Sequence, residues 1–252
     1  MQFSSPLIPG VFLRRYKRFF ADVRLDDGRV VIAHCANSGS MKTCFVEGGR
    51  VWLTHDDLPQ RKLKYTWQIA AVGRTRIFLH PTTSNTLAKE AIERGTLVEL
   101  TAYSQIQTEP RINPHTRFDL LLTRADGGKC FVEVKSATLA VGPGRIAFPD
   151  AVSERATKHL HELVNQAKLG NRAVLLFSAN RTDALSVEPA AEIDPVYAEA
   201  LRWASRHGVE ILAYRAAIST KRVELSERIA VLLEPTTTAT PGPSKERQNR
   251  RR

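Results

Sequence analysis

The stretch RFDLLLTRADGGKCFVEVK, residues 117–135, predicts two apolar strands joined by a turn. Asp126-Gly127 is a turn signal, and nearly continuous apolar runs flank it at 118–122 and 131–134. Runs of this kind are typical of strands buried on both faces, whereas an exposed hairpin alternates between apolar and polar positions. We therefore expect both strands in the interior of a sheet.

Three ionisable residues interrupt these strands: Asp119, Glu133 and Lys135. Glu133 and Lys135 are two positions apart on one strand, so their side chains point to the same face. A hairpin closed at Asp126-Gly127 places Asp119 opposite position 134, or opposite Glu133 if one residue bulges. In either register the two carboxylates can share a divalent ion, and Lys135 can orient an attacking water or stabilise charge on a phosphate.

The same three residues also fit an ordinary cross-strand charge pair on an exposed hairpin. Their apolar surroundings favour a functional site, because a buried charge without a partner or a metal is costly. Mg²⁺ or Mn²⁺ is the expected ion, since both prefer oxygen ligands. Without the ion the two carboxylates would repel each other, so we expect Glu133→Gln to stabilise the metal-free protein.

From residue 81 onward, helices and strands alternate, which indicates an α/β domain. Capping residues and glycines mark the helix ends, and apolar runs mark the strands. In chain order the predicted elements are a helix from Thr83 or Ser84 to Gly95, the two strands above, a longer helix from Asp150 or Ser153 to Gly170, a strand at 172–178, a helix from Asp194-Pro195 to Gly208 and a strand at 209–214.

Residues 10–80 predict strands without a convincing helix. Val11–Leu25 and Arg29–His34 flank the hairpin turn Asp26-Asp27-Gly28, and shorter strands are expected at 51–54 and 77–79. Several short strands in so few residues indicate a small β-barrel or sandwich. If 11–25 is one continuous strand, alternation places four residues on one face, namely Arg14, Tyr16, Arg18 and Phe20.

Positive charge is concentrated at the two ends of the 252-residue chain, whose formal net charge is +11. Residues 1–80 carry 13 Lys and Arg against 6 Asp and Glu, residues 81–234 carry 19 of each, and residues 235–252 carry 5 against 1. This distribution would favour a polyanionic partner such as nucleic acid, although it also fits simple solubility. The tail at 235–252 is rich in Thr, Pro, Gly and Ser, so we expect it to be disordered.

Basic residues that alternate with aromatic rings are typical of OB-fold surfaces that bind nucleic-acid strands. The candidate DNA-binding residues are Arg14, Arg15, Lys17 and Arg18, with a second cluster at Arg61, Lys62 and Lys64. Arg155 and His159 share a polar stripe on the longer helix, which fits either phosphate or site contacts or a solvated helix face. The segment 37–40 could offer backbone donors to a phosphate, or it could be a simple loop.

No apolar run reaches the roughly 18 residues of a membrane-spanning helix, and the first residues do not resemble a signal peptide. The three cysteines, Cys35, Cys44 and Cys130, form neither a disulfide framework nor a zinc-binding pattern. We therefore expect a cytoplasmic protein with free thiols, no membrane partner and no small-molecule cofactor.

Several short motifs occur together in this chain: RYKRF at 15–19 with ADV at 21–23, HCANSGSM at 34–41, RFD at 117–119, EVKSAT at 133–138, and FPDAVSER at 148–155 with KHL at 158–160. In this combination the chain resembles the sugar fermentation stimulation protein A family up to about residue 234. The resemblance implies an OB-like β-barrel over 1–80, a PD-(D/E)xK nuclease-fold domain over 81–234, and non-specific DNA binding.

By this likeness Asp119, Glu133 and Lys135 fall on the nuclease-type motif, although Phe118 stands where the motif's name has proline. At the junction of the two domains, His80-Pro81 replaces the Val-Asn pair that is more usual in the family. Related nuclease folds often take a carboxylate from the preceding helix. Glu90 is therefore a candidate third metal ligand, with an exposed helix glutamate as the alternative.

Two functions fit these observations. One is a DNA-binding protein, largely without sequence preference, that cleaves phosphodiester bonds with Mg²⁺. The other is a non-catalytic DNA-binding regulator of sugar metabolism genes that uses a silent nuclease fold. The retained acidic residues favour the first, because a pure binder gains nothing from carboxylates placed against phosphates; the family's description as a DNA binder favours the second. DNA and RNA cannot be distinguished from these residues.

Overall fold

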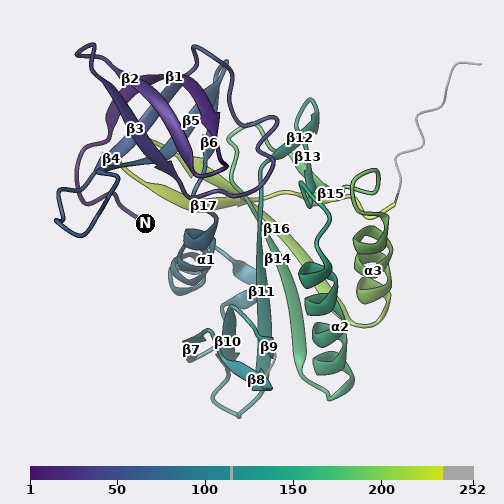
Figure 1. The fold of residues 1–252 in the computed structure, drawn as a ribbon. Helices are drawn as coiled ribbons and strands as arrows, with labels where there is room; N and C mark the ends of the chain where they lie inside the picture. The colour runs from purple at the N-terminus through teal and green to yellow at the C-terminus, as the bar shows by residue number, and fades with distance from the viewer. Residues whose placement is uncertain (114–115, 235–252) are drawn as a thin grey trace, which may run out of the picture.

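The computed structural model describes residues 1–113 and 116–234, so the predicted disordered tail at 235–252 lies outside the described residues. A β-barrel formed by the first third of the chain stands against a larger body made of a sheet and three α-helices (Figure 1). No helix in the described part of the chain is long and apolar enough to cross a membrane.

Six strands form the barrel, in the order β3-β2-β1-β4-β5-β6. Their bounds are β1 Ile8–Tyr16, β2 Phe20–Leu25, β3 Val30–Cys35, β4 Arg50–His55, β5 Tyr65–Val72 and β6 Thr75–Phe78. A parallel pairing of β3 with β5 closes the first five strands, while β6 extends the sheet from β5. Alternate residues of β2 and β4 are buried, and the rings of Phe12 and Trp67 stack inside at 5.0 Å. The predicted OB-like barrel is confirmed.

The expectation of one continuous strand over 11–25 is wrong. A turn at residues 17–19 separates β1 from β2, with Lys17 at φ 46° and Arg18 at φ 62°. Left-handed backbone is usually signalled by glycine or asparagine, and neither is present here, so the sequence carries no mark of this turn. Arg18 consequently lies at the turn, while the rings of Tyr16 and Phe20 face each other across the hairpin at 5.5 Å.

The larger body contains a mixed sheet in the order β17-β16-β14-β11-β10-β7. Its strands are β7 Gln105–Thr108, β10 Leu120–Thr123, β11 Lys129–Ala137, β14 Arg172–Ala179, β16 Val209–Ile218 and β17 Val223–Arg228. The central strands β11, β14 and β16 are parallel, and β11 lies between β10 and β14. As predicted, residues 130–134 are buried.

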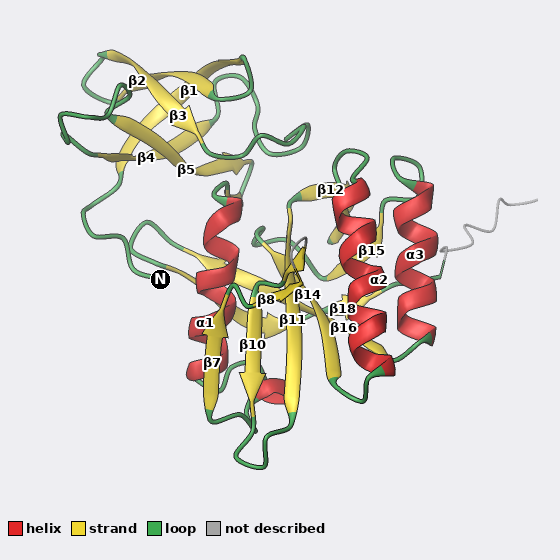
Figure 2. Ribbon diagram, turned by 60° about the horizontal axis from the view of Figure 1, so that its bottom comes forward, coloured by secondary structure: helices red, strands yellow, loops and turns green. Residues whose placement is uncertain are grey.

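Helices cover both faces of this sheet (Figure 2). α1, Ser84–Glu93, packs on one face, whereas α2, Glu154–Lys168, and α3, Pro195–Arg206, pack on the other. Side chains along β11 therefore point alternately to the two faces of the sheet: Val132 and Val134 pack on the α1 side, and Phe131 packs on the α2 side. Glu133 shares the period of Phe131, so its carboxylate points towards α2.

The predicted helix caps are largely confirmed. Ser153 caps α2 by accepting a hydrogen bond from Ala156 N at 3.3 Å, and Asp194 caps α3 by accepting one from Tyr197 N at 2.9 Å. α1 begins differently, because a 3₁₀ turn at Pro81–Thr83 precedes it and the Thr83 hydroxyl donates to the His80 carbonyl at 2.6 Å.

The remaining short elements were not predicted. They are the 3₁₀ turn Val98–Leu100 and the strands β8 Arg111–Asn113, β9 Thr116–Arg117, β12 Leu139–Gly142, β13 Arg145–Phe148, β15 Ser186–Pro189 and β18 Ala230–Val231. In the barrel, β5 was likewise not predicted.

Arg181 joins the barrel to the larger body. Its side chain is buried, and its Nη1 donates to the carbonyl of Thr43 at 2.8 Å and to that of Thr138 at 3.3 Å. Its other nitrogens bond the carboxylate of Asp183 at 2.9 Å. Because Thr43 belongs to the barrel and Thr138 follows β11, one guanidinium ties the two units at the point where β11 ends.

Replacing Arg181 with methionine should lower the free energy of unfolding by about 2–4 kcal/mol, because two carbonyls lose a charged donor in a buried setting. Urea unfolding followed by circular dichroism measures the change. Arg222→Met is the matched control: Arg222 is 61% exposed and pairs with Glu224 at the surface, so its loss should cost less than about 1 kcal/mol. Equal effects of the two variants would contradict this role of Arg181.

Candidate functional site

Asp119 and Glu133 lie on neighbouring strands at the same level of the sheet. Leu120 pairs with Val132, and this register brings Asp119, the residue before β10, opposite Glu133. Of the two predicted registers, the one with an extra residue in the connection is therefore correct. The predicted pair of carboxylates is assembled.

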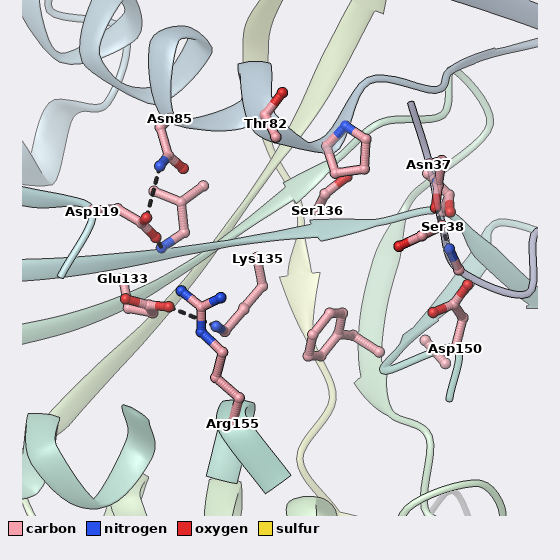
Figure 3. Close-up of a pocket in the computed structure, with 16 residues that line it drawn as sticks. Asn37, Ser38, Thr82, Asn85, Asp119, Glu133, Lys135, Ser136, Asp150 and Arg155 are labelled. Carbon is pink, nitrogen blue, oxygen red and sulfur yellow. Dashed lines mark hydrogen bonds and ion pairs between the residues drawn. The ribbon is translucent and has the colours of Figure 1, made fainter. Parts of the chain in front are cut away.

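Two donors hold the carboxylate of Asp119 (Figure 3). Asn85 Nδ2, from the first turn of α1, donates to Oδ1 at 2.7 Å, and the backbone N–H of Val134 donates to Oδ2 at 2.7 Å. Burial raises the pKa of Asp119 above its usual value, and the charge of Glu133 raises it further. The metal-free site therefore disfavours the ionised form of Asp119.

Glu133 is more deeply buried, with a side chain that is only 3% exposed. Its Oε1 accepts a hydrogen bond from Lys135 Nζ at 2.6 Å and is also hydrogen-bonded to Nδ1 of His159. Burial by itself raises the pKa of Glu133, but the hydrogen bond to His159 and the charge of Lys135 outweigh it, and the pKa is lowered. Its other oxygen, Oε2, is buried and has no hydrogen-bond partner among the described residues.

This arrangement corrects the expectation that Glu133→Gln stabilises the metal-free protein. The charge of Glu133 is already balanced by Lys135 and by hydrogen bonding to His159. Asp119, and not Glu133, is therefore the carboxylate whose ionised form is disfavoured in the metal-free site. A hairpin considered alone does not include α2, and α2 supplies the histidine.

His159 is a site residue, but it is not an exposed one. Its ring is buried against Glu133 and meets Phe118 edge to face at a centroid distance of 6.3 Å. Arg155, one turn earlier on α2, is exposed and points into the pocket (Figure 3). Within the described ranges Arg155 makes no ion pair, so its guanidinium is available to an anion.

Glu90 does not join this group. Its carboxylate pairs with the amino group of Met1 and, at 3.2 Å, with Arg94. The α1 residue beside Asp119 is Asn85, which was not predicted. Helical spacing could have identified Asn85, because it lies three positions before the buried Ala88 and seven before the buried Ile92, on the helix face that packs on the sheet.

The carboxylates open into a cavity of about 370 Å³ between the barrel and the larger body. Lys135 and Arg155 line it together with the carboxylate of Asp150, and residues 37–39 of the barrel form its far wall (Figure 3). In the described part of the chain, no three His, Cys, Asp or Glu side chains group closely enough to hold a metal ion by themselves. Asp119 and Glu133 are the two carboxylates that meet at this end of the pocket.

Most of the predicted DNA-binding residues of the barrel already have partners. Arg14 pairs with Asp22 at 2.6 Å, Arg61 with Asp56 at 3.0 Å and Lys64 with Asp57 at 3.6 Å. Arg15 donates to three backbone carbonyls, those of Arg18, Asn37 and Gly39, at 3.0, 2.8 and 3.1 Å. Lys17, Arg18 and Lys62 carry side chains without an ion pair in the part of the chain that the structure describes.

Opposite effects on stability are expected when the two carboxylates are neutralised at pH 7 in EDTA. The raised pKa of Asp119 makes a stabilising contribution that is present below its unfolded pKa and is lost as pH rises through its folded pKa. The lowered pKa of Glu133 also makes a stabilising contribution, which is present above the unfolded pKa of Glu133 and is lost as pH falls through its folded pKa. Asp119→Asn should therefore raise the melting temperature by a few degrees, and Glu133→Gln should lower it.

Thermal unfolding at pH 7 and at pH 4 measures both effects, and both should shrink at the lower pH as the wild-type carboxyl groups approach protonation. A shift of the same sign for the two variants at pH 7 would show that Lys135 and His159 do not balance the charge of Glu133.

Two domain families match this chain. Residues 13–79 match the SfsA N-terminal OB domain, and residues 82–222 match the sugar fermentation stimulation protein RE domain. A sugar fermentation stimulation protein homolog from Geobacter sulfurreducens is 48% identical over 232 residues, covering 92% of this chain and 99% of that protein. A homolog from Maricaulis maris is 46% identical over 235 residues, covering 90% of this chain and 100% of that protein.

A solved structure agrees with these matches. The structure of Pyrococcus furiosus SfsA in complex with Ca²⁺ has a TM-score of 0.81 and 28% sequence identity to this chain, covering 92% of this chain and 98% of that one. The predicted order, an OB-like barrel followed by a nuclease-type α/β domain, is confirmed. The chain belongs to the sugar fermentation stimulation protein family.

Proposed function

We propose that this protein binds DNA with little sequence preference and hydrolyses its phosphodiester bonds, using Mg²⁺ or Mn²⁺ held by Asp119 and Glu133. The observation that carries the proposal is the meeting of two carboxylates and a lysine at the bottom of a pocket that also contains Arg155, an arginine without an ion pair among the described residues. Such a combination suits phosphodiester hydrolysis, because charge develops on the phosphate while a water attacks it.

The chemistry of the donors fits a hard divalent ion. Glu133 Oε2 is a buried carboxylate oxygen without a hydrogen-bond partner in the described part of the chain, which is costly unless an ion or a water satisfies it. Each oxygen of Asp119 accepts one hydrogen bond and retains a further lone pair for an ion. A divalent ion, when bound, would polarise the phosphate and lower the pKa of a water. The Ca²⁺ in the Pyrococcus furiosus structure supports divalent-ion binding in this family.

The side chains around the ion site have separate tasks in this proposal. Asn85 and the Val134 N–H fix the orientation of Asp119, while His159 fixes that of Glu133. Lys135, whose side chain is 12% exposed, can both hold Glu133 and reach a phosphate or a water in the pocket. Arg155 binds a non-bridging phosphate oxygen, a role that suits a planar guanidinium.

One observation favours the second candidate, a DNA-binding regulator with a silent nuclease fold. Lys135 and His159 both occupy Oε1 of Glu133, and together they balance the carboxylate without an ion. A site that satisfies itself in this way has less need of a metal. Metal binding and cleavage are therefore the measurements that separate the two functions.

Saturating Mg²⁺ or Mn²⁺ should raise the melting temperature, because an ion at about 100 times its Kd stabilises the folded state by about 2.7 kcal/mol. Asp119→Asn should remove most of this gain. Lys135→Ala should retain most of it and abolish cleavage of labelled DNA, because lysine acts on the phosphate or the water and is not an ion ligand. Wild-type protein with neither a metal-dependent shift nor cleavage would identify the silent binder.

DNA affinity should depend on the unpaired basic residues at the β1–β2 turn. Reversing both charges, Lys17→Glu with Arg18→Glu, should weaken binding about tenfold, or about 1.4 kcal/mol, and should reduce the salt dependence of the Kd. Fluorescence anisotropy over a range of salt concentrations measures both quantities. Arg15 is left intact because it holds the backbone of 37–39.

The matched control reverses two exposed lysines, Lys129 and Lys168, at the start of β11 and the end of α2. This end of the larger body is the one farther from the barrel (Figure 1). Equal losses of affinity in the control and in the turn variant would mean that net charge, and not the turn, determines binding.

A further inference from the structure

The far wall of the pocket belongs to the barrel. Residues 37–39 follow β3 and face the carboxylate end of the pocket across Lys135 and Arg155 (Figure 3). Asn37 is buried, whereas Ser38 is exposed and has no hydrogen-bond partner among the described residues. A ligand that touches Asp119 and Glu133 therefore has an unoccupied hydroxyl and backbone N–H opposite it.

This wall is fixed from both sides. Arg15 donates to the carbonyls of Asn37 and Gly39, and the Asn37 side chain accepts from the N–H of Gly39 at 2.8 Å. On the other side, a Cβ at Gly39 would lie 2.4 Å from Asp150 Oδ2, so any larger residue would require the Asp150 carboxylate to move. Asp150 also accepts from Ser40 Oγ at 3.3 Å. These contacts hold the barrel wall at a set separation from the larger body.

The reactive groups lie deep between these walls. The side chains of Glu133 and Lys135 are 3% and 12% exposed, so a phosphate must enter the pocket to reach them. A cavity of about 370 Å³ is near the lower limit of ligand pockets, which begin at roughly 300 Å³. It suits a group the size of one nucleotide. A nucleotide that is paired in a duplex would have to be extruded before it could enter such a pocket, at a cost of a few kcal/mol.

An aromatic ring adds to this preference. Phe148 lines the pocket, and its ring packs against those of Tyr197, at a centroid distance of 5.3 Å, and Phe177, at 5.8 Å. Aromatic rings in single-strand sites stack against unpaired bases, at about 1–3 kcal/mol per base. Bases inside an intact duplex are stacked on each other and do not offer that face.

We infer that the pocket takes an unpaired nucleotide, with a phosphate of that strand on the Asn37–Gly39 wall, so that single-stranded nucleic acid is preferred to intact duplex. This inference rests on the proposed function for the identity of the ligand, a nucleic-acid strand. It goes beyond that function in naming the form of the strand and the barrel residues that receive it.

The test compares one labelled DNA oligonucleotide as a single strand and as a blunt duplex. Affinity is measured by fluorescence anisotropy in Ca²⁺, an ion that also takes oxygen ligands, and cleavage is measured in Mg²⁺ or Mn²⁺. The single strand should bind about tenfold more tightly than the duplex. Ser38→Glu adds a negative charge to the wall and should remove most of that advantage. Ser5→Glu, an identical change at an exposed serine outside this pocket, should leave it intact.

Equal or tighter binding of the duplex, or an unchanged single-strand affinity in Ser38→Glu, would overturn the inference. Absence of cleavage for both substrates would instead overturn the nuclease proposal. In that case the inference is decided by the affinities alone: loss of single-strand binding in Ser38→Glu supports it, and retention rejects it. Unaltered melting temperatures of the two serine variants show that any loss reflects the pocket and not folding.

Discussion

A carboxylate buried in the central strand of a sheet is the constraint on which the rest of this structure depends. Glu133 lies on β11 between two neighbouring strands, where an uncompensated charge would be strongly destabilising. Compensation comes from Lys135 on the same strand and from His159 on α2. The charge of Glu133 is therefore fully balanced only when α2 packs on the sheet. Well-packed apolar residues often stabilise a protein interior as well as a buried ion pair does, so stability alone does not account for the cluster.

The parts of the site that follow from local geometry could be predicted from the sequence. Period-two alternation placed Glu133 and Lys135 on one face, and a short hairpin brought Asp119 near them. The register remained open because the length of the connection, and not the strands, determines it. The burial of His159 could not be predicted, because a polar stripe on a helix does not reveal whether water or a buried carboxylate faces it.

Contacts distant in sequence account for the other differences. Glu90 was a reasonable metal ligand on α1, but the amino group of Met1 neutralises it, and the two are 89 positions apart. Charge counting likewise identified a basic barrel without showing that Arg14 and Arg61 have acidic neighbours. The Lys17-Arg18 turn was missed because left-handed backbone at non-glycine residues is stabilised here by the hairpin and not by local preference.

The barrel and the pocket differ in net charge. Three carboxylates line the cavity, those of Asp119, Glu133 and Asp150, and two cations, Lys135 and Arg155, line it with them, so the cavity offers a phosphate backbone little net attraction from a distance. The larger body, residues 81–234, is neutral overall and adds no attraction at a distance, whereas the first 80 residues carry a net charge of +7. In the proposed function the positive charge of the barrel would attract the strand, and the ion and Lys135 would act once the phosphate is inside the pocket. The contacts at Gly39 and Arg181 hold the barrel against the larger body. In the proposed function this would align a strand that is bound by the barrel with the groups at the bottom of the pocket.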